Sequence, residues 1–437
     1  NSGSRLPGRF ATFPSPWRTV EMSGRHENSR LHAFDNVRGL AAVAVVALHS
    51  TYAYAIFPLP GLIWPVPLDE PSRIADAAFW AIEGSVMPLF FTLSGYFLAR
   101  SLARQSSSRV LAGRTRRLLL PMATVGLVVL VVDLHVWVLG LVATDRATVR
   151  EYRRLKFSPE IQTDLFGPAH LWYIEYLWII CTVVCGCVWL GRRMSRGAEA
   201  SKSRILPSVA LRKGAILTAC GFAVFAASVW AILSLAPQIV LGFQHGWLPD
   251  PAKLAHAGVF LLFGMLLQRS ESLTTITRRL APMSLAAAAV TLAFLLPRIH
   301  DALRNETSSS VSLGLGGLLA LFAIAATLGQ IGAGTRWLDR ERPSLSRLAA
   351  ASFWIYLVHH PLLGLLEVIA RPLPLPALMK CASVFLVTLA VCLWSYERFA
   401  AGGLIAGLLD GELPRRALRT PEPTVAPSPA PERRQAA

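Results

Sequence analysis

The sequence predicts an all-α membrane protein, a bundle of about ten transmembrane helices with both termini in the cytoplasm. Hydrophobic residues make up 53% of the 437 residues and charged residues only 16%, well below the roughly 25% of soluble domains. The hydrophobic residues come in runs of about twenty, the length that an α-helix needs to cross a bilayer. The net charge of +17 arises from basic residues in short connections between these runs. Membrane topology therefore accounts for them better than nucleic-acid binding.

The chain begins with a polar segment, residues 1–33, that is rich in Ser, Pro and Arg. It has no hydrophobic core, which distinguishes it from a secretory signal peptide. Met22 is the first methionine, so residues 1–21 are interpreted as translated upstream sequence or a mobile tail. We expect a transmembrane domain over residues 34–399, followed by a disordered, Pro- and Ala-rich cytoplasmic tail over residues 400–437.

Ten hydrophobic runs are expected to span the membrane. The sixth and seventh are short, and His256 with Gly258 and Gly264 makes the sixth look tilted, broken or buried within protein. In order, the predicted spans lie near residues 37–57, 75–99, 118–143, 170–190, 214–235, 254–267, 282–297, 311–331, 349–369 and 377–397.

The distribution of Lys and Arg predicts the orientation. These residues are more frequent in the connections after the even-numbered spans, for example Arg114, Arg116 and Arg117. The positive-inside rule therefore places these connections and both termini in the cytoplasm. The connection after the third span, residues 144–169, carries charges of both signs and is the longest predicted external segment. It is expected either to bind a substrate or to form a solvated lid.

The cysteines provide no evidence for a redox or metal centre. All six lie within hydrophobic runs, and no two form a CxxC pair. They are therefore interpreted as small packing residues rather than as a disulfide framework. We expect no metal site for the same reason.

The first span carries the strongest candidate for chemistry. An ionisable residue at membrane depth is costly, and His49 is therefore a candidate functional residue. His49 follows Arg38 by eleven positions, which places both on one helical stripe about 16 Å apart. The two residues either line one groove, or His49 is a core histidine that bonds to a neighbouring helix. Their spacing leaves both interpretations open.

Polar residues in the second and third spans allow two interpretations each. Ser94 and Gly95 are small residues that let helices approach closely. The cluster from Arg114 to Arg117 is either a topological anchor or a binding site for a phosphorylated cytoplasmic ligand, because guanidinium groups suit phosphate oxygens. Asp133 and His135 are isolated polar residues that either pair with neighbours or line a cavity.

Aromatic and histidine residues mark the fourth and ninth spans. His170 and Trp172 open the fourth span, where they belong either to an interfacial aromatic belt or to a sugar-binding platform. In the ninth span, Tyr356 can share a helix face with His359 or with the adjacent His360. Two adjacent histidines in lipid are expensive without partners, so we expect them to have partners.

The order of these residues resembles the membrane acyltransferase-3 family, whose members move acyl groups onto extracytoplasmic carbohydrates. The resemblance runs from Phe34 to about Glu397. The matching motifs are Asp-x-x-Arg and Arg-x10-His (Asp35, Arg38, His49), FFxxSGYF (Phe90 to Phe97), RxxRxxxP (Arg114, Arg117, Pro121), HLW (His170 to Trp172) and IYLxHxP (Ile355 to Pro361). Within the family, YLVHHPL and the closing Tyr396 and Glu397 look most like a glucan-modifying branch that adds succinyl groups.

The resemblance implies an O-acyltransferase in a bacterial inner membrane. It implies acyl-coenzyme A as donor, with a succinyl or acetyl group, no permanently bound cofactor, and a periplasmic glucan or other envelope carbohydrate as acceptor. Glucan-synthesis or export proteins are possible partners. It implies a catalytic role for His49, as general base or nucleophile. Arg38, Arg114 and Arg117 would bind the donor, and the implied acceptor-binding or oxyanion-stabilising residues are His170, Trp172, Tyr356 and His359.

Two other functions are compatible with a polytopic bundle that buries polar groups. A transporter would move a glycan, lipid or acyl donor without chemistry, and such proteins often show inverted repeats with paired broken helices. We find no such repeat in the sequence. A structural subunit of a glucan-export assembly is the other alternative, although it would give the histidines within the membrane no purpose.

Overall fold

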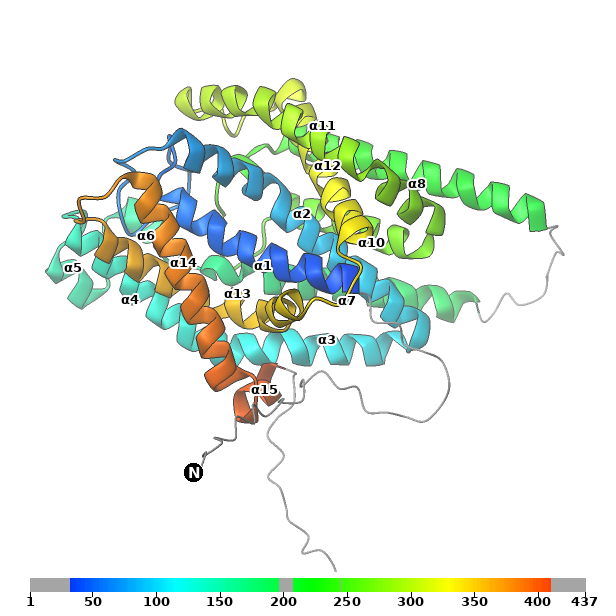
Figure 1. Ribbon diagram of the computed structural model, residues 1–437, viewed down its shortest axis with the longest axis horizontal. Coiled ribbons are helices and arrows are strands. Elements are labelled where there is room, and N and C mark those ends of the chain that lie inside the picture. The colour runs from blue at the N-terminus through cyan, green and yellow to red at the C-terminus, as the bar shows by residue number, and fades with distance from the viewer. Residues whose placement is uncertain (1–31, 196–206, 245, 410–437) are drawn as a thin grey trace, which may run out of the picture.

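The computed structural model describes residues 32–195, 207–244 and 246–409, and this part of the chain is helical throughout apart from connections (Figure 1). It confirms the predicted all-α class. The helices are α1 (His32–Tyr52), α2 (Arg73–Arg104), α3 (Ser107–Pro121), η1 (Met122–Gly126), α4 (Leu127–Ala143), α5 (Val149–Arg154), α6 (Pro159–Leu165), η2 (Ala169–Leu171), α7 (Trp172–Ser195), α8 (Pro207–Leu235), α9 (Gln238–Leu241), α10 (Pro251–Arg269), α11 (Glu271–Arg304), α12 (Leu313–Trp337), α13 (Pro343–Ala370), α14 (Ala377–Ser395), η3 (Tyr396–Ala400) and α15 (Gly403–Leu409).

Each predicted span corresponds to a helical segment. Among the described residues, nine helical segments are long and apolar enough to cross a membrane. The remaining predicted span is α1, which has 21 residues with polar residues near both ends and is not among those nine. It also ends at Tyr52 rather than near residue 57, where the prediction placed its end. The chain then continues as an irregular segment up to α2.

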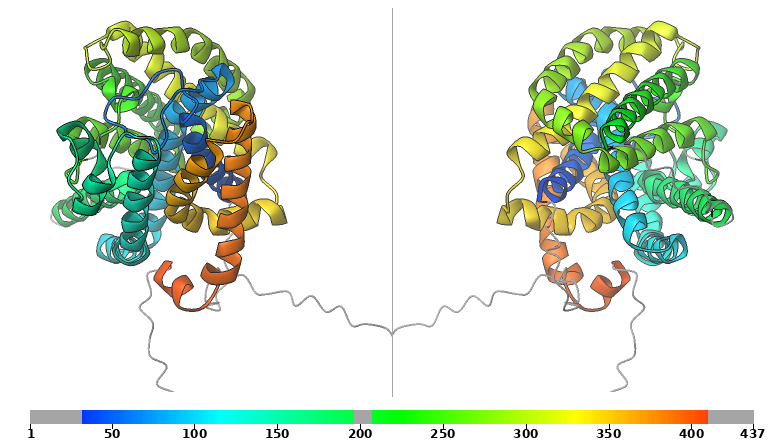
Figure 2. Two further views of the ribbon diagram at one scale, coloured as in Figure 1. Left: turned by 90° about the vertical axis from the view of Figure 1, so that its left-hand side faces the viewer. Right: turned by 90° about the vertical axis from the view of Figure 1, so that its right-hand side faces the viewer.

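The position of α1 explains how a helix with polar ends is accommodated. It packs most extensively against α13 and α2, and it also contacts α12 and α14. Viewed from either side, α1 lies inside the ring of surrounding helices (Figure 2). Because neighbouring helices supply much of its surroundings, α1 needs fewer apolar side chains than a helix that faces lipid.

Glycines allow the closest helix contact, between α2 and α10. A Cβ atom on Gly95 would lie 1.9 Å from the carbonyl oxygen of Leu261, and one on Gly264 would lie 1.9 Å from that of Thr92. No side chain fits at either place, so the small residues permit close backbone approach. The helix α10 is unbroken and packs against protein. Of the three expectations for the sixth span, burial within protein therefore applies.

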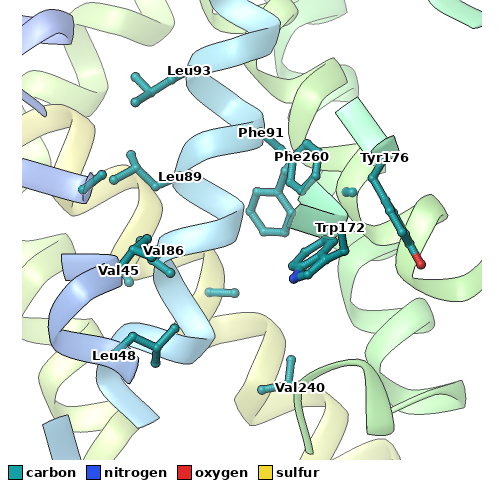
Figure 3. Packing of buried hydrophobic residues seen from close by; sticks show 14 of the residues in the cluster. Val45, Leu48, Val86, Leu89, Phe91, Leu93, Trp172, Tyr176, Val240 and Phe260 are labelled. Atoms are coloured by element: carbon teal, nitrogen blue, oxygen red, sulfur yellow. The ribbon is translucent and has the colours of Figure 1, made fainter. Parts of the chain in front are cut away.

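The helix α2 also divides the core that surrounds the site. In Figure 3, Leu89 lies on the side of α2 that faces Val45 of α1. Phe91 lies on the opposite side, beside Phe260 and Trp172, and its ring centroid is 6.3 Å from that of Trp172. The two faces of α2 therefore hold α1 and the start of α7 in fixed positions.

The third predicted span is the second half of a longer segment. Helices α3, η1 and α4 run without a break from Ser107 to Ala143, and the π-helix η1 begins directly after Pro121. Proline lacks the N–H of the regular helical bond, and π-turns commonly absorb such a defect. The continuation into α4 sets the direction in which that helix presents its polar residues.

The chain after the last span differs from the prediction. Residues 403–409 were assigned to a disordered tail, yet they form the short helix α15. It packs against α3, because the sequence GLIAGLL is apolar enough to need a partner surface. Residues 32 and 33, predicted as the end of the N-terminal tail, already belong to α1. The remainder of the two predicted tails, residues 1–31 and 410–437, lies outside the described residues.

Candidate functional site

A cavity of about 250 Å³ lies at the end of α1 that carries His49. Its walls come from α1, α2, α4, α6, η2, α7, α10 and α13, together with the connections before α2, before η2 and after α9. The lining is mostly apolar with a few convergent polar groups, as in most small-molecule sites. Its polar and aromatic residues are His49, Tyr52, Trp64, Phe79, Glu83, Asp133, Trp137, Asp164, Phe166, His170, Trp172, Phe243, Trp247, Lys253, Tyr356 and His360.

Four histidines from three elements come together at this cavity. The ring centroid of His49 in α1 lies 4.9 Å from that of His360 and 5.2 Å from that of His359, both in α13. His170 in η2 stacks on His360 with centroids 4.6 Å apart. The structure thus brings the predicted residues His49, His170 and His359 together, although more than 300 positions separate the first from the last.

The adjacent histidines of α13 play different parts. His360 lines the cavity, whereas His359 is not among the residues of the wall. The Nδ1 atom of His359 bonds within its own helix, 2.9 Å from the carbonyl oxygen of Ile355 and 3.0 Å from that of Tyr356. Successive side chains on a helix point about 100° apart, so only one of the two can face the cavity.

His360 has a carboxylate partner on a neighbouring helix. Its Nδ1 atom lies 2.7 Å from Oδ1 of Asp133 in α4, and both side chains are buried. One face of the His360 imidazole stacks on the ring of Trp137, with ring centroids 4.2 Å apart. Asp133 therefore both pairs with a neighbour and lines the cavity. His135, two positions later, is exposed and bonds through Nδ1 to the carbonyl oxygen of Val131.

His170 and Tyr356 fix each other across the cavity wall. The Nε2 atom of His170 lies 3.1 Å from the carbonyl oxygen of Leu357. In return, the hydroxyl of Tyr356 donates to the carbonyl oxygen of His170. Both residues line the cavity, as expected for residues that bind substrate. The Nδ1 atom of His170 is buried and has no hydrogen-bond partner among the described residues.

The predicted sugar platform, Trp172, already has a cation on its ring. Nζ of Lys253 lies 3.8 Å from the ring centroid of Trp172 and 5.1 Å from that of Phe243. The Lys253 side chain is buried and lines the same cavity as Glu83 of α2. A cation over an aromatic face is attracted by the ring quadrupole. The wall therefore holds a buried cation beside Trp172, and Lys253 also interacts electrostatically with the carboxyl of Glu83.

A second tryptophan closes the cavity from the connection between α1 and α2. Trp64 is buried, and its Nε1–H donates to Oε2 of Glu367 in α13 over 2.6 Å. Its ring stacks near that of His49, with centroids 6.0 Å apart. One hydrogen bond thus anchors an irregular segment directly over the predicted catalytic histidine.

Of the predicted donor-binding arginines, Arg38 lies toward the other end of α1, and Arg114 and Arg117 lie on α3. We call these three residues the arginine region. The guanidinium of Arg38 lies 3.2 Å from Asp35 and donates to the carbonyl oxygen of Ala349 over 3.3 Å. Arg114 is half-buried on α3, and Arg117 is exposed. Among the three, Arg117 is thus the one most open to solvent.

Two tyrosines connect the arginine region with the histidine cavity. Arg38 and Arg114 both interact electrostatically with Tyr173, whose hydroxyl forms a 2.8 Å hydrogen bond with Oγ of Ser94. The rings of Tyr173 and Tyr356 lie 5.9 Å apart, and Tyr356 in turn contacts His170. Ring contacts from Tyr173 through Tyr356 to His170 therefore lead from a side chain near Arg38 and Arg114 to the histidine cavity.

Three residues of the cavity wall have the donor types of a metal site. Asp133, His170 and His360 each offer one ligand atom, and these atoms lie within 4.8 Å of one another. A carboxylate with two imidazoles suits a divalent ion such as zinc. The expectation from the sequence that no metal binds stays a prediction.

Glu83, Lys253 and Trp64 belong to the site but are not among the residues that the sequence predicts for it. Glu83 has the same signal as Asp133, because it is an isolated charge within an apolar run, and Lys253 lies directly before such a run. Trp64 had none, because it lies in an irregular segment. The connection after the third predicted span contributes Asp164 to the wall. That segment therefore forms part of the site.

The comparison with protein-family models and the comparison with individual known proteins are consistent with each other. The acyltransferase 3 model, described as an acyltransferase domain, matches residues 31–397. Glucans biosynthesis protein C of Escherichia coli O17:K52:H18 (strain UMN026) is 23% identical over 348 residues, or 76% of this chain and 82% of that protein. The same protein of Escherichia coli O6:K15:H31 (strain 536) is 24% identical over 342 residues, and that of Shigella dysenteriae serotype 1 is 23% identical over 350, with the same shares. No solved structure matches significantly.

Proposed function

Because the chain belongs to the acyltransferase 3 family and is a multi-pass membrane O-acyltransferase, we propose that it acylates a periplasmic glucan or other envelope carbohydrate. The acyl group, preferably succinyl and alternatively acetyl, comes from cytoplasmic acyl-coenzyme A, and the protein lies in a bacterial inner membrane with both termini in the cytoplasm. The observation that carries this proposal is the meeting of His49, His170 and His360 at one cavity, connected by tyrosines to an arginine region.

The arginine region supports a phosphorylated donor. Coenzyme A carries several phosphate groups, and guanidinium groups bind phosphate oxygens with paired hydrogen bonds. Arg38 and Arg114 both act on Tyr173 and so lie on the same side of the bundle. The pantetheine arm would pass Tyr173 and Tyr356 and bring the thioester to the histidine cavity. This path has the direction that transfer from one face of the membrane to the other requires.

The histidine cavity supports acyl transfer. His49 is half-buried and lines the cavity, and a neutral imidazole there can act as a general base on a hydroxyl or attack a thioester itself. Nε2 of His170 bonds to the carbonyl oxygen of Leu357, and the hydroxyl of Tyr356 donates to the carbonyl oxygen of His170. These two hydrogen bonds keep the cavity wall in shape. We therefore assign the catalytic role in acyl transfer to His49.

The buried cation Lys253 in the cavity wall favours a succinyl group over an acetyl group. A succinyl group ends in a free carboxylate, which needs a cation when it is taken out of water. Lys253 is buried, faces the cavity, and is held by the rings of Trp172 and Phe243. The acceptor is proposed from the relatives, whose name gives glucan biosynthesis as their role.

Mass spectrometry of envelope and periplasmic glycans tests the proposal. The samples come from a deletion strain complemented with the wild-type gene or with His49→Ala. We expect the wild type to restore a succinyl or acetyl substituent and His49→Ala, expressed to the same level, to leave it absent. Unchanged substitution with glycan accumulating on the wrong side of the membrane would instead identify a transporter.

A further inference from the structure

His360 is the most firmly oriented imidazole of the cavity. Its Nδ1 atom lies 2.7 Å from the Asp133 carboxylate. Its ring lies between two parallel rings, that of Trp137 at 4.2 Å and that of His170 at 4.6 Å. The hydrogen bond sets the rotation of the imidazole, and the two stacked rings prevent it from tilting. Only Nε2 remains available to a molecule in the cavity.

His49 lacks such a partner. Among the described residues, none forms a hydrogen bond with its ring nitrogens, and its contacts are ring contacts with Trp64, His359 and His360. A general base needs a fixed tautomer and a fixed direction, and catalytic imidazoles commonly obtain both from a carboxylate on the second nitrogen. By this criterion His360 is better suited to move a proton than His49.

We propose that His360 is the general base that deprotonates the acceptor hydroxyl, and that Asp133 is its positioning residue. This inference rests on the proposed acyltransferase function and divides its chemistry between two histidines. An ionised carboxylate accepts hydrogen bonds only. The Asp133 bond therefore keeps the proton of neutral His360 on Nδ1 and leaves the lone pair of Nε2 toward the cavity.

The step balances with the groups present and the two substrates. The acceptor hydroxyl gives its proton to Nε2 of His360 while its oxygen attacks the carbonyl carbon of the thioester. The new C–O bond forms, the C–S bond breaks, and the electron pair of that bond leaves on sulfur. The thiolate then takes the proton from Nε2, which restores neutral His360 and yields the ester and free thiol. Asp133 stabilises the transient imidazolium and is not itself protonated.

This division leaves His49 for the thioester. Its ring lies 4.9 Å from that of His360, so both can reach one reacting centre. His49 would hydrogen-bond to the carbonyl oxygen or attack the carbonyl carbon, and in the second case His360 activates the hydroxyl in the following step. In both cases His360 serves the acceptor and His49 serves the donor.

Kinetics of the purified full-length protein in nanodiscs test the inference. The variants are Asp133→Asn, His360→Ala and the pair combined, with succinyl-coenzyme A as donor and a glucan as acceptor. His135→Gln is the matched control, because His135 is an exposed histidine on the helix of Asp133 and does not line the cavity. Thermal unfolding of each variant, measured in the same nanodiscs, selects those that are folded.

We expect each single variant to lower kcat by about 10²-fold to 10⁴-fold, the range of general-base catalysis, with the donor KM unchanged. The combined variant should be no slower than His360→Ala, because residues that act as one unit are not additive. Added imidazole should restore part of the rate of His360→Ala but none of the rate lost in Asp133→Asn, whose own imidazole still fills the space. His135→Gln should retain the wild-type rate.

Three results would overturn the inference. One is a folded Asp133→Asn protein with a kcat near that of the wild type. Another is stoichiometric zinc in the active protein together with loss of activity on chelation, which would make Asp133, His170 and His360 metal ligands. A wild-type protein that transfers no acyl group would overturn the proposed function as well. An active wild type with an active Asp133→Asn variant overturns the inference alone.

Discussion

Arg38 of the arginine region and His49 of the histidine cavity lie toward opposite ends of α1, and the two regions are built in different ways. The arginine region keeps permanent charges where they are partly exposed, as Arg117 is on α3. The histidine cavity uses groups that can be neutral and secures them with neighbours, as Asp133 secures His360. The difference follows the cost of charge at membrane depth, which permanent charges avoid near the surface and titratable groups avoid by neutrality or pairing.

We therefore propose that the donor binds at one end and that acyl transfer takes place at the other. Charged groups near a membrane face can hold a strongly hydrated donor, whereas an enclosed cavity excludes water from a reacting thioester. Tyr173 and Tyr356 lie between the two ends. If the assignment is right, variants at the two ends should change different kinetic constants.

The largest effect is expected from His49→Ala. We expect kcat for acyl transfer to fall by about 10³-fold, since the variant removes a catalytic imidazole, while binding of the donor, measured directly by calorimetry, stays close to that of the wild type. Ser50→Ala is the control on the same helix, because the Ser50 hydroxyl bonds to the carbonyl oxygen of Ala47. Loss of donor binding in His49→Ala would break the separation of the two ends.

Arg114→Ala should change the donor KM instead. Removing a hydrogen bond to a charged group costs about 1.5–3 kcal/mol, so the KM for the donor should rise about 10-fold to 100-fold with little change in kcat. The control is Arg116→Ala, because Arg116 is exposed and its Nε–H bonds to the carbonyl oxygen of Ala112 in its own helix. A drop in kcat at unchanged KM would place Arg114 in the chemistry and contradict the comparison.

Trp64→Phe tests how the cavity is held closed. The variant keeps an aromatic ring but leaves the buried carboxyl of Glu367 without its 2.6 Å hydrogen bond. An unsatisfied buried group costs about 1–3 kcal/mol, so we expect a lower thermal unfolding temperature in detergent. The double variant Trp64→Phe with Glu367→Leu should recover part of it. If the double variant is no more stable than Trp64→Phe, the bond does not anchor this segment.

The smallest effect is expected at the surface pair that ties the same connection to the end of α13. Arg371 donates two hydrogen bonds to Asp69, of 3.0 and 2.7 Å, and these lower the pKa of the Asp69 carboxyl. The pair therefore adds stability above the ordinary aspartate pKa of about 3.9, and this is lost as the pH falls through the lowered value. Because Asp69 is half exposed, the contribution is at most about 1 kcal/mol.

Asp69→Asn measures this contribution through thermal unfolding at several pH values. We expect a small loss of stability at pH 7 that shrinks once the pH falls below the ordinary aspartate pKa of about 3.9 and disappears below the lowered pKa, where the wild-type carboxylate is protonated too. A difference that persists unchanged in acid would show that the asparagine disturbs the connection for another reason.

The transmembrane architecture and most candidate residues of the site could be predicted from the amino-acid sequence. The length of a hydrophobic run is a local property of the sequence, so each predicted span corresponds to a helical segment. Residues 403–409, predicted to belong to a disordered tail, are also an apolar run and form a helix. The family motifs predicted His49, Arg38 and Arg114 as site residues, because the order of the motifs along the chain can be read from the sequence.

Which of these residues lie together, and which side chains pair, could be seen only in the tertiary structure. The orientation of α13 about its axis places His360 and not His359 in the cavity wall. Helical periodicity alone does not predict which of two adjacent residues faces a cavity. The bond between Asp133 and His360 joins positions 227 apart, and the cation over Trp172 comes from Lys253 in another helix. Such pairings depend on how helices turn and lean against one another, which is set by packing across the whole bundle rather than by the local sequence.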